Sequence, residues 1–162
     1  MNLTKEQIVW GLLRLGMGWI FFWAFIDKVF GFGFATVAGK GWIDGFSPTF
    51  GFLKFATRGP LAGIYQAMAG SPVVDWLFMI GLLGIGLAFL LGIGMRIATI
   101  SGVLMYALMY TAGFMPPEHN PFLDEHIMFP LLMVGLTMIN AGQWLGFGGW
   151  WQNTKIAQKW PV

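Results

Sequence analysis

The sequence predicts an all-α integral membrane protein, a four-helix transmembrane bundle with short interfacial helices in its long first loop. Four apolar segments carry this prediction, each close to the roughly 20 residues with which a helix spans a bilayer. Composition agrees, because 57% of the residues are hydrophobic and 10% are charged, outside the usual soluble range. Helices are expected because the hydrocarbon core offers no water to the backbone. We expect a single domain over residues 1–162, with helices at about 8–30, 73–94, 97–115 and 122–145.

The first helix opens with a recognisable start signal. Thr4 precedes Gln7 by three residues, which predicts a capping box. The helix carries Arg14 within its apolar stretch and ends near Asp27 and Lys28. The stretch is longer than the apolar part of a signal peptide, so we expect no cleavable signal and interpret the segment as the first span.

Residues 31–71 form a long loop that is rich in glycine and aromatic residues. Structureless loops of this length are uncommon in compact folds. We therefore expect short helices over 47–57, with Pro48 in the first turn, and over 60–69. Their aromatic side chains would lie on the membrane surface.

Ser71 and Pro72 predict the start of the second long helix, with the serine as N-cap and the proline at the first helical position. Within this helix small residues recur every four positions, at Gly84, Ala88 and Gly92. Such a row allows another helix to approach closely. We expect it to pack within the bundle or across a homo-oligomer.

The third and fourth helices carry fewer polar groups. Tyr106 and Tyr110 lie on one face of the third helix at helical spacing, where they could line a quinone pocket or simply pack in the core. Asn120 and Pro121 predict the start of the fourth helix. Pro130 falls inside that helix and should kink it.

Several classes of function are excluded by composition. The chain has no cysteine, which rules out disulfides, thiol redox chemistry and thiolate metal sites. The net charge is only +2 and the basic residues are scattered, so we expect no nucleic-acid partner. The glycine run over 31–41 lacks the Ser or Thr that a P-loop needs after its lysine, so we expect no nucleotide site. The spacing of His119 and His126 matches no metal motif, so we expect no metal site.

Four spans place both termini on one side of the membrane and the long loop on the other. The distribution of basic residues favours termini in the cytoplasm. Six of the seven acidic residues fall on the loop side. Ionisable groups in membranes are costly and are usually functional, so we expect any site at the loop-side end.

Three kinds of group could form this site. Lys28 and Arg58 could hold a small anion, with Asp27 beside the lysine. Arg14 is the deepest charge; it either extends to the interface or makes an intramembrane ion pair or anion contact. The third group, at the start of the fourth helix, is either a solvated acidic loop or a means of proton transfer; its members are Asp124, Glu125 and His126.

Three segments of the chain are similar to those of a known family. The predicted first helix, LLRLGMGWIFFWAFIDKVFG, resembles the opening of DoxX/DoxD proteins. Two further segments resemble the DoxD branch in particular: FSPTFGFLKFATRGPLAGIYQAMAGSPVVDWLFMIGLLGIG and NPFLDEHIMFPLLMVGLTMINAGQWLGFGGWW. Together these segments cover most of the chain.

The resemblance implies a thiosulfate:quinone oxidoreductase-like subunit in a prokaryotic plasma membrane. Such enzymes join two thiosulfates into tetrathionate and pass two electrons to membrane quinone, a diffusible acceptor rather than a bound cofactor. A DoxA-like partner subunit accompanies them. In this interpretation Lys28 and Arg58 bind the anion, and Glu125 and His126 move protons toward the quinone. The first alternative is a non-catalytic subunit that anchors or assembles a redox complex. A transporter ranks last, because transporters usually contain internal repeats and the two halves of this chain show none.

Overall fold

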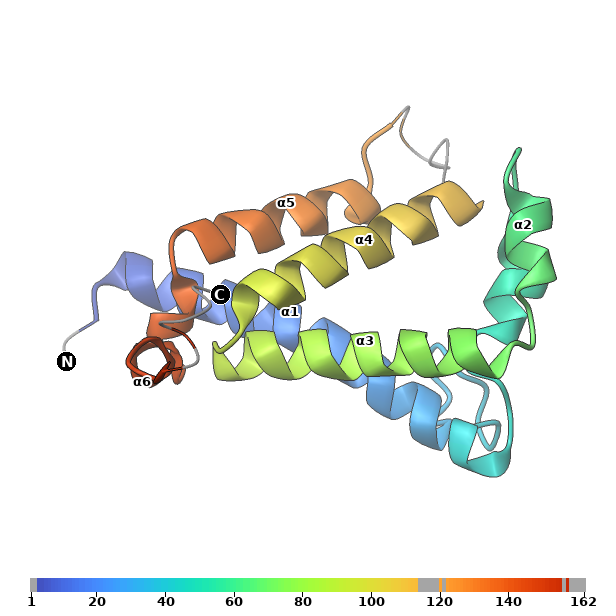
Figure 1. The fold of residues 1–162 in the computed structure, drawn as a ribbon, viewed down its shortest axis with the longest axis horizontal. Helices are drawn as coiled ribbons and strands as arrows, with labels where there is room; N and C mark the ends of the chain where they lie inside the picture. Colours follow the sequence, from blue (N-terminus) through green and yellow to red (C-terminus); the bar gives the residue numbers. More distant parts are fainter. Residues whose placement is uncertain (1–2, 114–119, 121, 156, 158–162) are drawn as a thin grey trace.

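The computed structural model describes residues 3–113, 120, 122–155 and 157, and every regular element among them is helical. Three short helical turns connect the main elements: η1 (Trp42–Asp44), η2 (Phe52–Ala56) and η3 (Ala141–Gln143). The α-helices, coloured in chain order in Figure 1, are α1 (Lys5–Phe30), α2 (Ala62–Ala67), α3 (Pro72–Leu91), α4 (Met95–Gly113), α5 (Glu125–Met138) and α6 (Gly148–Gln152).

Three helices, α1, α3 and α4, are long and apolar enough to cross a membrane. The fourth predicted span is shorter than expected: α5 has 14 residues, a length of about 21 Å against the roughly 30 Å of a bilayer core. The predicted range 122–145 was wrong at both ends. Asp124 caps the start, and Asn140, with a φ of +54°, interrupts the backbone before the chain enters η3.

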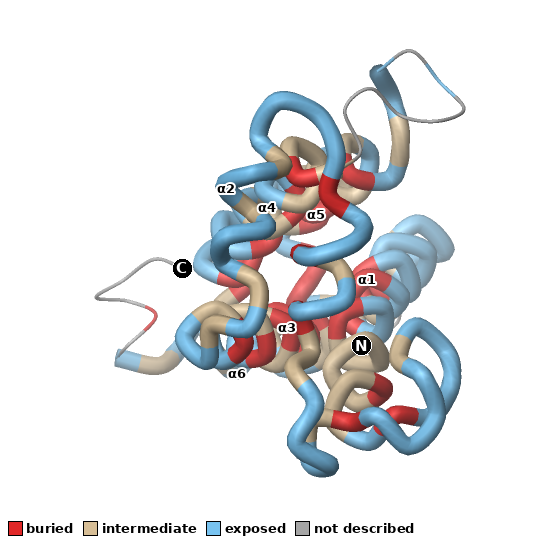
Figure 2. Tube along the Cα trace, turned by 90° about the vertical axis from the view of Figure 1, so that its right-hand side faces the viewer, coloured by how far each residue is buried: buried red, intermediate tan, exposed pale blue. Residues whose placement is uncertain are grey.

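One apolar core joins α1, α3, α4 and α5. Buried residues lie where these helices face one another, and the outward surfaces are exposed (Figure 2). Many large apolar side chains point outward, as expected of helices that face lipid rather than water. The core is formed by Met17, Phe21, Met79, Leu82, Ile85, Phe89, Met95, Ala98, Tyr106, Met133, Leu136 and Ala141.

The close contact between α1 and α3 depends on Gly18 and Gly86. A Cβ on Gly86 would lie 2.7 Å from the backbone nitrogen of Phe22, and one on Gly18 would lie 2.6 Å from that of Leu90. Of the predicted row, Gly84 is exposed and its Cβ direction points into open space, whereas Gly92 meets the backbone of Gly142. Packing of the row across a homo-oligomer stays a prediction. The interface follows the face of α3 that carries Gly86, which is half a turn from Gly84.

The long loop has less helix than predicted. Helical residues run over 50–56 in place of the expected 47–57, with η2 as their π-helical part, and the helix expected over 60–69 is the short helix α2. Two contacts hold this part of the loop against α4. The backbone N–H of Arg58 donates to the carbonyl of Ala112 at 2.9 Å, and the hydroxyls of Tyr65 and Thr111 are 2.7 Å apart.

The two ends of the helices have different neighbours. Leu3 lines the same surface hollow as Leu145 and Phe147, so the start of the chain lies beside the segment that precedes α6. The end of α1, the start of α3 and the start of α5 lie at the other end, with the long loop (Figure 1). The orientation of these ends in a membrane stays a prediction.

Candidate functional site

The candidate site lies at the loop-side end, where α5 begins. Asp124 is the N-cap of α5, and its side chain accepts a hydrogen bond from the backbone N–H of His126 at 2.9 Å. The other carboxylate oxygen is 3.0 Å from Nδ1 of His126. The same carboxylate therefore fixes the start of the helix and the orientation of the imidazole ring.

His126 is 6% exposed, and its ring contacts the aromatic core. The ring of Tyr106 meets it edge-on with centroids 5.8 Å apart. Tyr106 also makes edge contacts with Phe21 at 5.5 Å and Phe129 at 6.0 Å. The histidine is thus the polar end of an aromatic cluster that reaches from α5 through α4 to α1.

Glu125 lies beside this pair but is exposed. Ligand atoms of Asp124, Glu125 and His126 come within 4.8 Å of one another. This arrangement could hold a cation, but three adjacent residues with one solvent-exposed member match no defined metal motif. His119, the other histidine considered from the sequence, lies outside the described residues.

Asp27 holds the loop that follows α1. It is 1% exposed and accepts hydrogen bonds from the backbone N–H groups of Phe34 at 3.3 Å and Thr36 at 2.7 Å. A buried carboxylate that accepts backbone bonds in this way fixes the path of the chain. These hydrogen bonds explain why the Asp27 carboxylate is buried, and no bound substrate is needed to explain it.

The two cations predicted to hold an anion, Lys28 and Arg58, are not joined in this structure. The ammonium group of Lys28 lies 5.9 Å from the ring centroid of Phe78 on α3, a cation–π contact. Arg58 is exposed and contacts the end of α4 through its backbone. Within the described part of the chain, no hydrogen bond links these two side chains.

Arg14 lies at the opposite end, and its guanidinium does not extend to water. It is fully buried. Nη1 donates to the carbonyls of Phe89 and Leu90, and Nη2 donates to those of Trp144 at 3.1 Å and Leu145 at 2.9 Å. All four Nη hydrogens are used by backbone oxygens, while Nε has no partner among the described residues.

Two polar contacts were missed by reasoning from the sequence. Asp75, at the start of α3, accepts hydrogen bonds from Ser47 Oγ at 2.8 Å and Thr49 Oγ1 at 2.5 Å. Thr99 and Thr137 join α4 to α5 through hydroxyls 2.7 Å apart. The position of Asp75 in a first turn was visible in the sequence, but its loop partners, 26 and 28 residues away, left no local signal.

Comparisons with protein-family models, curated proteins and solved structures found no match. Over its described residues, the structure defines an all-helical chain in which three helices are long and apolar enough to cross a membrane.

Proposed function

We propose that this chain is a four-helix, multi-pass subunit of a membrane oxidoreductase that passes electrons from a small sulfur oxyanion to quinone. The observation that carries the proposal is the buried His126–Asp124 pair beside Tyr106. It places a titratable group between the polar loop-side end and an apolar, aromatic interior. The sequence resemblance to DoxD proteins supplies the substrate class, thiosulfate.

The proposed reaction sets the requirements for the site. Two thiosulfate ions form a sulfur–sulfur bond and release two electrons as tetrathionate forms. Quinone takes up those two electrons and two protons to become quinol. The protein must therefore hold dianions, admit quinone from the lipid and deliver protons at the quinone oxygens.

His126 and Glu125 are the proposed proton carriers. Glu125 is exposed and can exchange protons with water, whereas His126 is buried against Tyr106. Imidazole suits transfer near neutral pH, and Asp124 orients the ring through Nδ1. Protons would pass from Glu125 to His126 and then to a quinone beside the aromatic cluster.

Lys28 and Arg58 remain the proposed anion ligands, since Arg58 is exposed and lies on the loop. Thiosulfate would have to bring the two side chains together. Asp27 and Arg14 are already bonded to backbone groups, so we assign them to the fold rather than to the substrate. A DoxA-like partner subunit would complete the site on the loop side.

A non-catalytic subunit that assembles a redox complex is the second candidate. One observation favours it: Arg14, Asp27 and Asp75, the most buried charged groups outside the His126 pair, are all bonded to backbone groups or to loop hydroxyls. Such a chain would need only lipid, a partner subunit or a second copy to bind.

Thiosulfate-dependent reduction of decylubiquinone by the purified protein, with and without a DoxA-like partner, tests the proposal. His126→Ala should lower turnover by about 10²-fold or more if the ring carries protons. Arg58→Gln should raise the thiosulfate KM with little change in kcat, because it removes a ligand of the bound anion. Lys40→Gln, which removes an exposed loop cation outside the site, is the matched control.

If His126→Ala and Arg58→Gln both keep the kinetic constants of an active parent protein, the site assignment is wrong. Absence of activity with every sulfur oxyanion, in the presence of the partner, would favour the non-catalytic subunit.

A further inference from the structure

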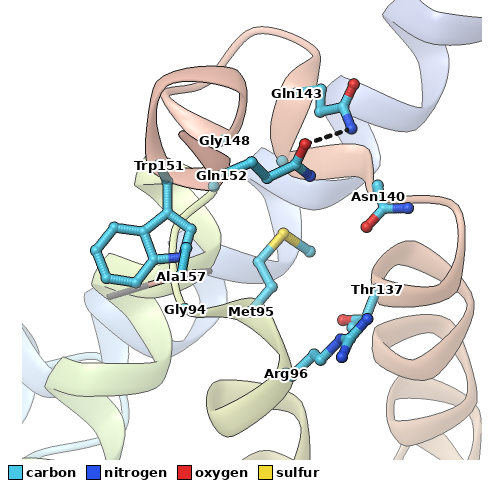
Figure 3. Close-up of a pocket in the computed structure, with 12 residues that line it drawn as sticks. Gly94, Met95, Arg96, Thr137, Asn140, Gln143, Gly148, Trp151, Gln152 and Ala157 are labelled. Atoms are coloured by element: carbon cyan, nitrogen blue, oxygen red, sulfur yellow. Dashed lines mark hydrogen bonds between the residues drawn. The ribbon is translucent and has the colours of Figure 1, made fainter. Parts of the chain in front are cut away.

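A polar pocket lies at the end of the molecule opposite the His126 pair. It has a volume of about 240 Å³ and is formed where α4 begins, where α5 ends and where η3 and α6 follow. Figure 3 shows the indole of Trp151 on one side, Asn140, Thr137 and Arg96 on the other, and Gln143 bonded to Gln152 across the upper part.

The floor of the pocket is rigid because backbones meet there without side chains. A Cβ on Gly92 would lie 2.6 Å from the carbonyl oxygen of Gly142, and one on Gly148 would lie 2.5 Å from the same oxygen. Gly92 also has a φ of +75° as the C-cap of α3, a conformation that favours glycine. The pocket is therefore built into the fold rather than left by a loose loop.

The chemistry of the lining suits an anion. Among the described lining residues, Arg96 is the charged group; it also takes part in an interaction within the chain, so a ligand would share its donors. Thr137, Asn140, Gln143 and Gln152 add hydroxyl and amide groups, which can donate hydrogen bonds. A guanidinium with neighbouring neutral donors is the donor set that phosphate prefers, because charge-assisted bonds to its oxygens are strong.

The position of the pocket suits the depth of lipid headgroups. The preceding turn of α5 ends in the exposed apolar side chain of Met138, and Trp150 beside the pocket is also exposed. Tryptophan gathers at the membrane–water interface, and basic pockets between helix ends bind phospholipid headgroups. The volume is below that of most sites for whole organic ligands, which fits a headgroup with its acyl chains outside.

We propose that this pocket binds a phosphate group, carried either by an anionic phospholipid headgroup or by a soluble phosphate ester. The site is independent of the proposed oxidoreductase activity, because it lies at the other end of the helices and shares none of its residues. A bound headgroup would join α4, α5 and α6 and fix the depth of this end in the bilayer.

The test uses the full chain purified in dodecyl maltoside. Dioleoylphosphatidylglycerol is titrated against dioleoylphosphatidylcholine, and retained lipid is measured by native mass spectrometry alongside the thermal midpoint. The parent should retain phosphatidylglycerol at least tenfold more tightly than phosphatidylcholine, whose phosphate is neutralised by choline. Glycerol 3-phosphate and inorganic phosphate, added separately, distinguish the sources: displacement of the lipid indicates a soluble ester site, and no displacement indicates a headgroup site.

Two variants change the pocket and one is the control. Arg96→Gln removes the cation. Gln152→Glu introduces a negative charge at an exposed position, on a side chain of nearly the same size as glutamine. Each variant should weaken phosphatidylglycerol binding about tenfold. Lys155→Gln removes an exposed charge at the same end, outside the described lining, and should leave binding unchanged.

Equal binding of the two lipids by the parent would overturn the proposal. So would parental binding in Gln152→Glu, which should fold even if Arg96→Gln does not, or an equal loss in Lys155→Gln, which would indicate general surface charge.

Discussion

Replacing Arg14 by methionine should destabilise the protein more than replacing any other charged residue at the end of the helices opposite the long loop. The guanidinium completes the hydrogen bonding of the last turn of α3. The last four carbonyls of a helix lack intrahelical partners. Here the carbonyl of Ala88 accepts from the N–H of Gly92 at 2.8 Å, and that of Leu91 accepts from the N–H of Phe147 at 2.8 Å. Arg14 donates to the two remaining carbonyls, those of Phe89 and Leu90.

The magnitude follows from the bonds that are lost. Methionine has a similar length but no donor, so four carbonyls lose their guanidinium partner: the buried one of Phe89 and the partly buried ones of Leu90, Trp144 and Leu145. Interhelical hydrogen bonds in membranes average about 0.6 kcal/mol, and bonds to charged groups about 1.5–3 kcal/mol. Relief from burying a charge offsets part of the upper value. We therefore expect the free energy of unfolding to fall by about 2–6 kcal/mol.

Reversible unfolding by SDS in mixed micelles, followed by circular dichroism, measures this loss. Arg14→Lys should fall between the parent and Arg14→Met, because an ammonium has three donors and cannot reproduce the planar fork. Arg58→Met is the control. It removes an exposed guanidinium whose residue is held through its backbone, and should change stability by less than about 0.5 kcal/mol. A loss in Arg14→Met as small as in Arg58→Met would refute the structural role.

Two further predictions concern helix packing and the long loop. Gly86→Ala places a Cβ against the backbone of α1 and should lower the free energy of unfolding by about 1–3 kcal/mol. In Gly84→Ala the new Cβ points into open space, so this variant should be neutral or stabilising by up to about 1 kcal/mol. Equal losses of stability on SDS titration would contradict the packing. Asp75→Ala removes the acceptor of the loop hydroxyls and should speed tryptic cleavage after Arg58 several-fold relative to Glu6→Ala. An unchanged cleavage rate would show that the loop is held elsewhere.

Features encoded by neighbouring residues could be predicted from the sequence. The capping box of Thr4 and Gln7 is confirmed, as are the helix start at Ser71 and Pro72 and the position of Pro130 inside α5. Each depends on residues within one turn of one another, where sequence spacing and spatial distance are nearly the same.

Features decided by tertiary contacts were harder to predict. Asn120 was expected to start the fourth helix, but its side chain accepts bonds from the backbone of Phe122 and Leu123 and so forms a turn, and Asp124 is the cap. The predicted helix continued past Ile139 to residue 145. Hydropathy could not reveal that Asn140 and Leu145 adopt positive φ values of 54° and 55°, in the segment where the carbonyls of Trp144 and Leu145 accept from Arg14.

The candidate site shows the same division between local and distant contacts. The Asp124–His126 pair is formed by residues two positions apart; the sequence grouped Asp124, Glu125 and His126, but the predicted proton partner of His126 was Glu125. The contact with Tyr106 joins two helices, so helical spacing could place that tyrosine on a face but could not identify its neighbour. Lys28 and Arg58 belong to different segments, and no local pattern determines the distance between them.

The buried polar groups follow a pattern that connects stability with function. Arg14, Asp27 and Asp75 each hold an irregular segment against the end of a long helix. A buried charge is tolerated where backbone or hydroxyl groups compensate it, so these three are explained by the fold. His126 is held by the carboxylate of Asp124, the N-cap of its own helix, and its ring faces Tyr106 in the apolar interior. It therefore lies between the exposed Glu125 and the aromatic cluster, and we place the proposed proton transfer there.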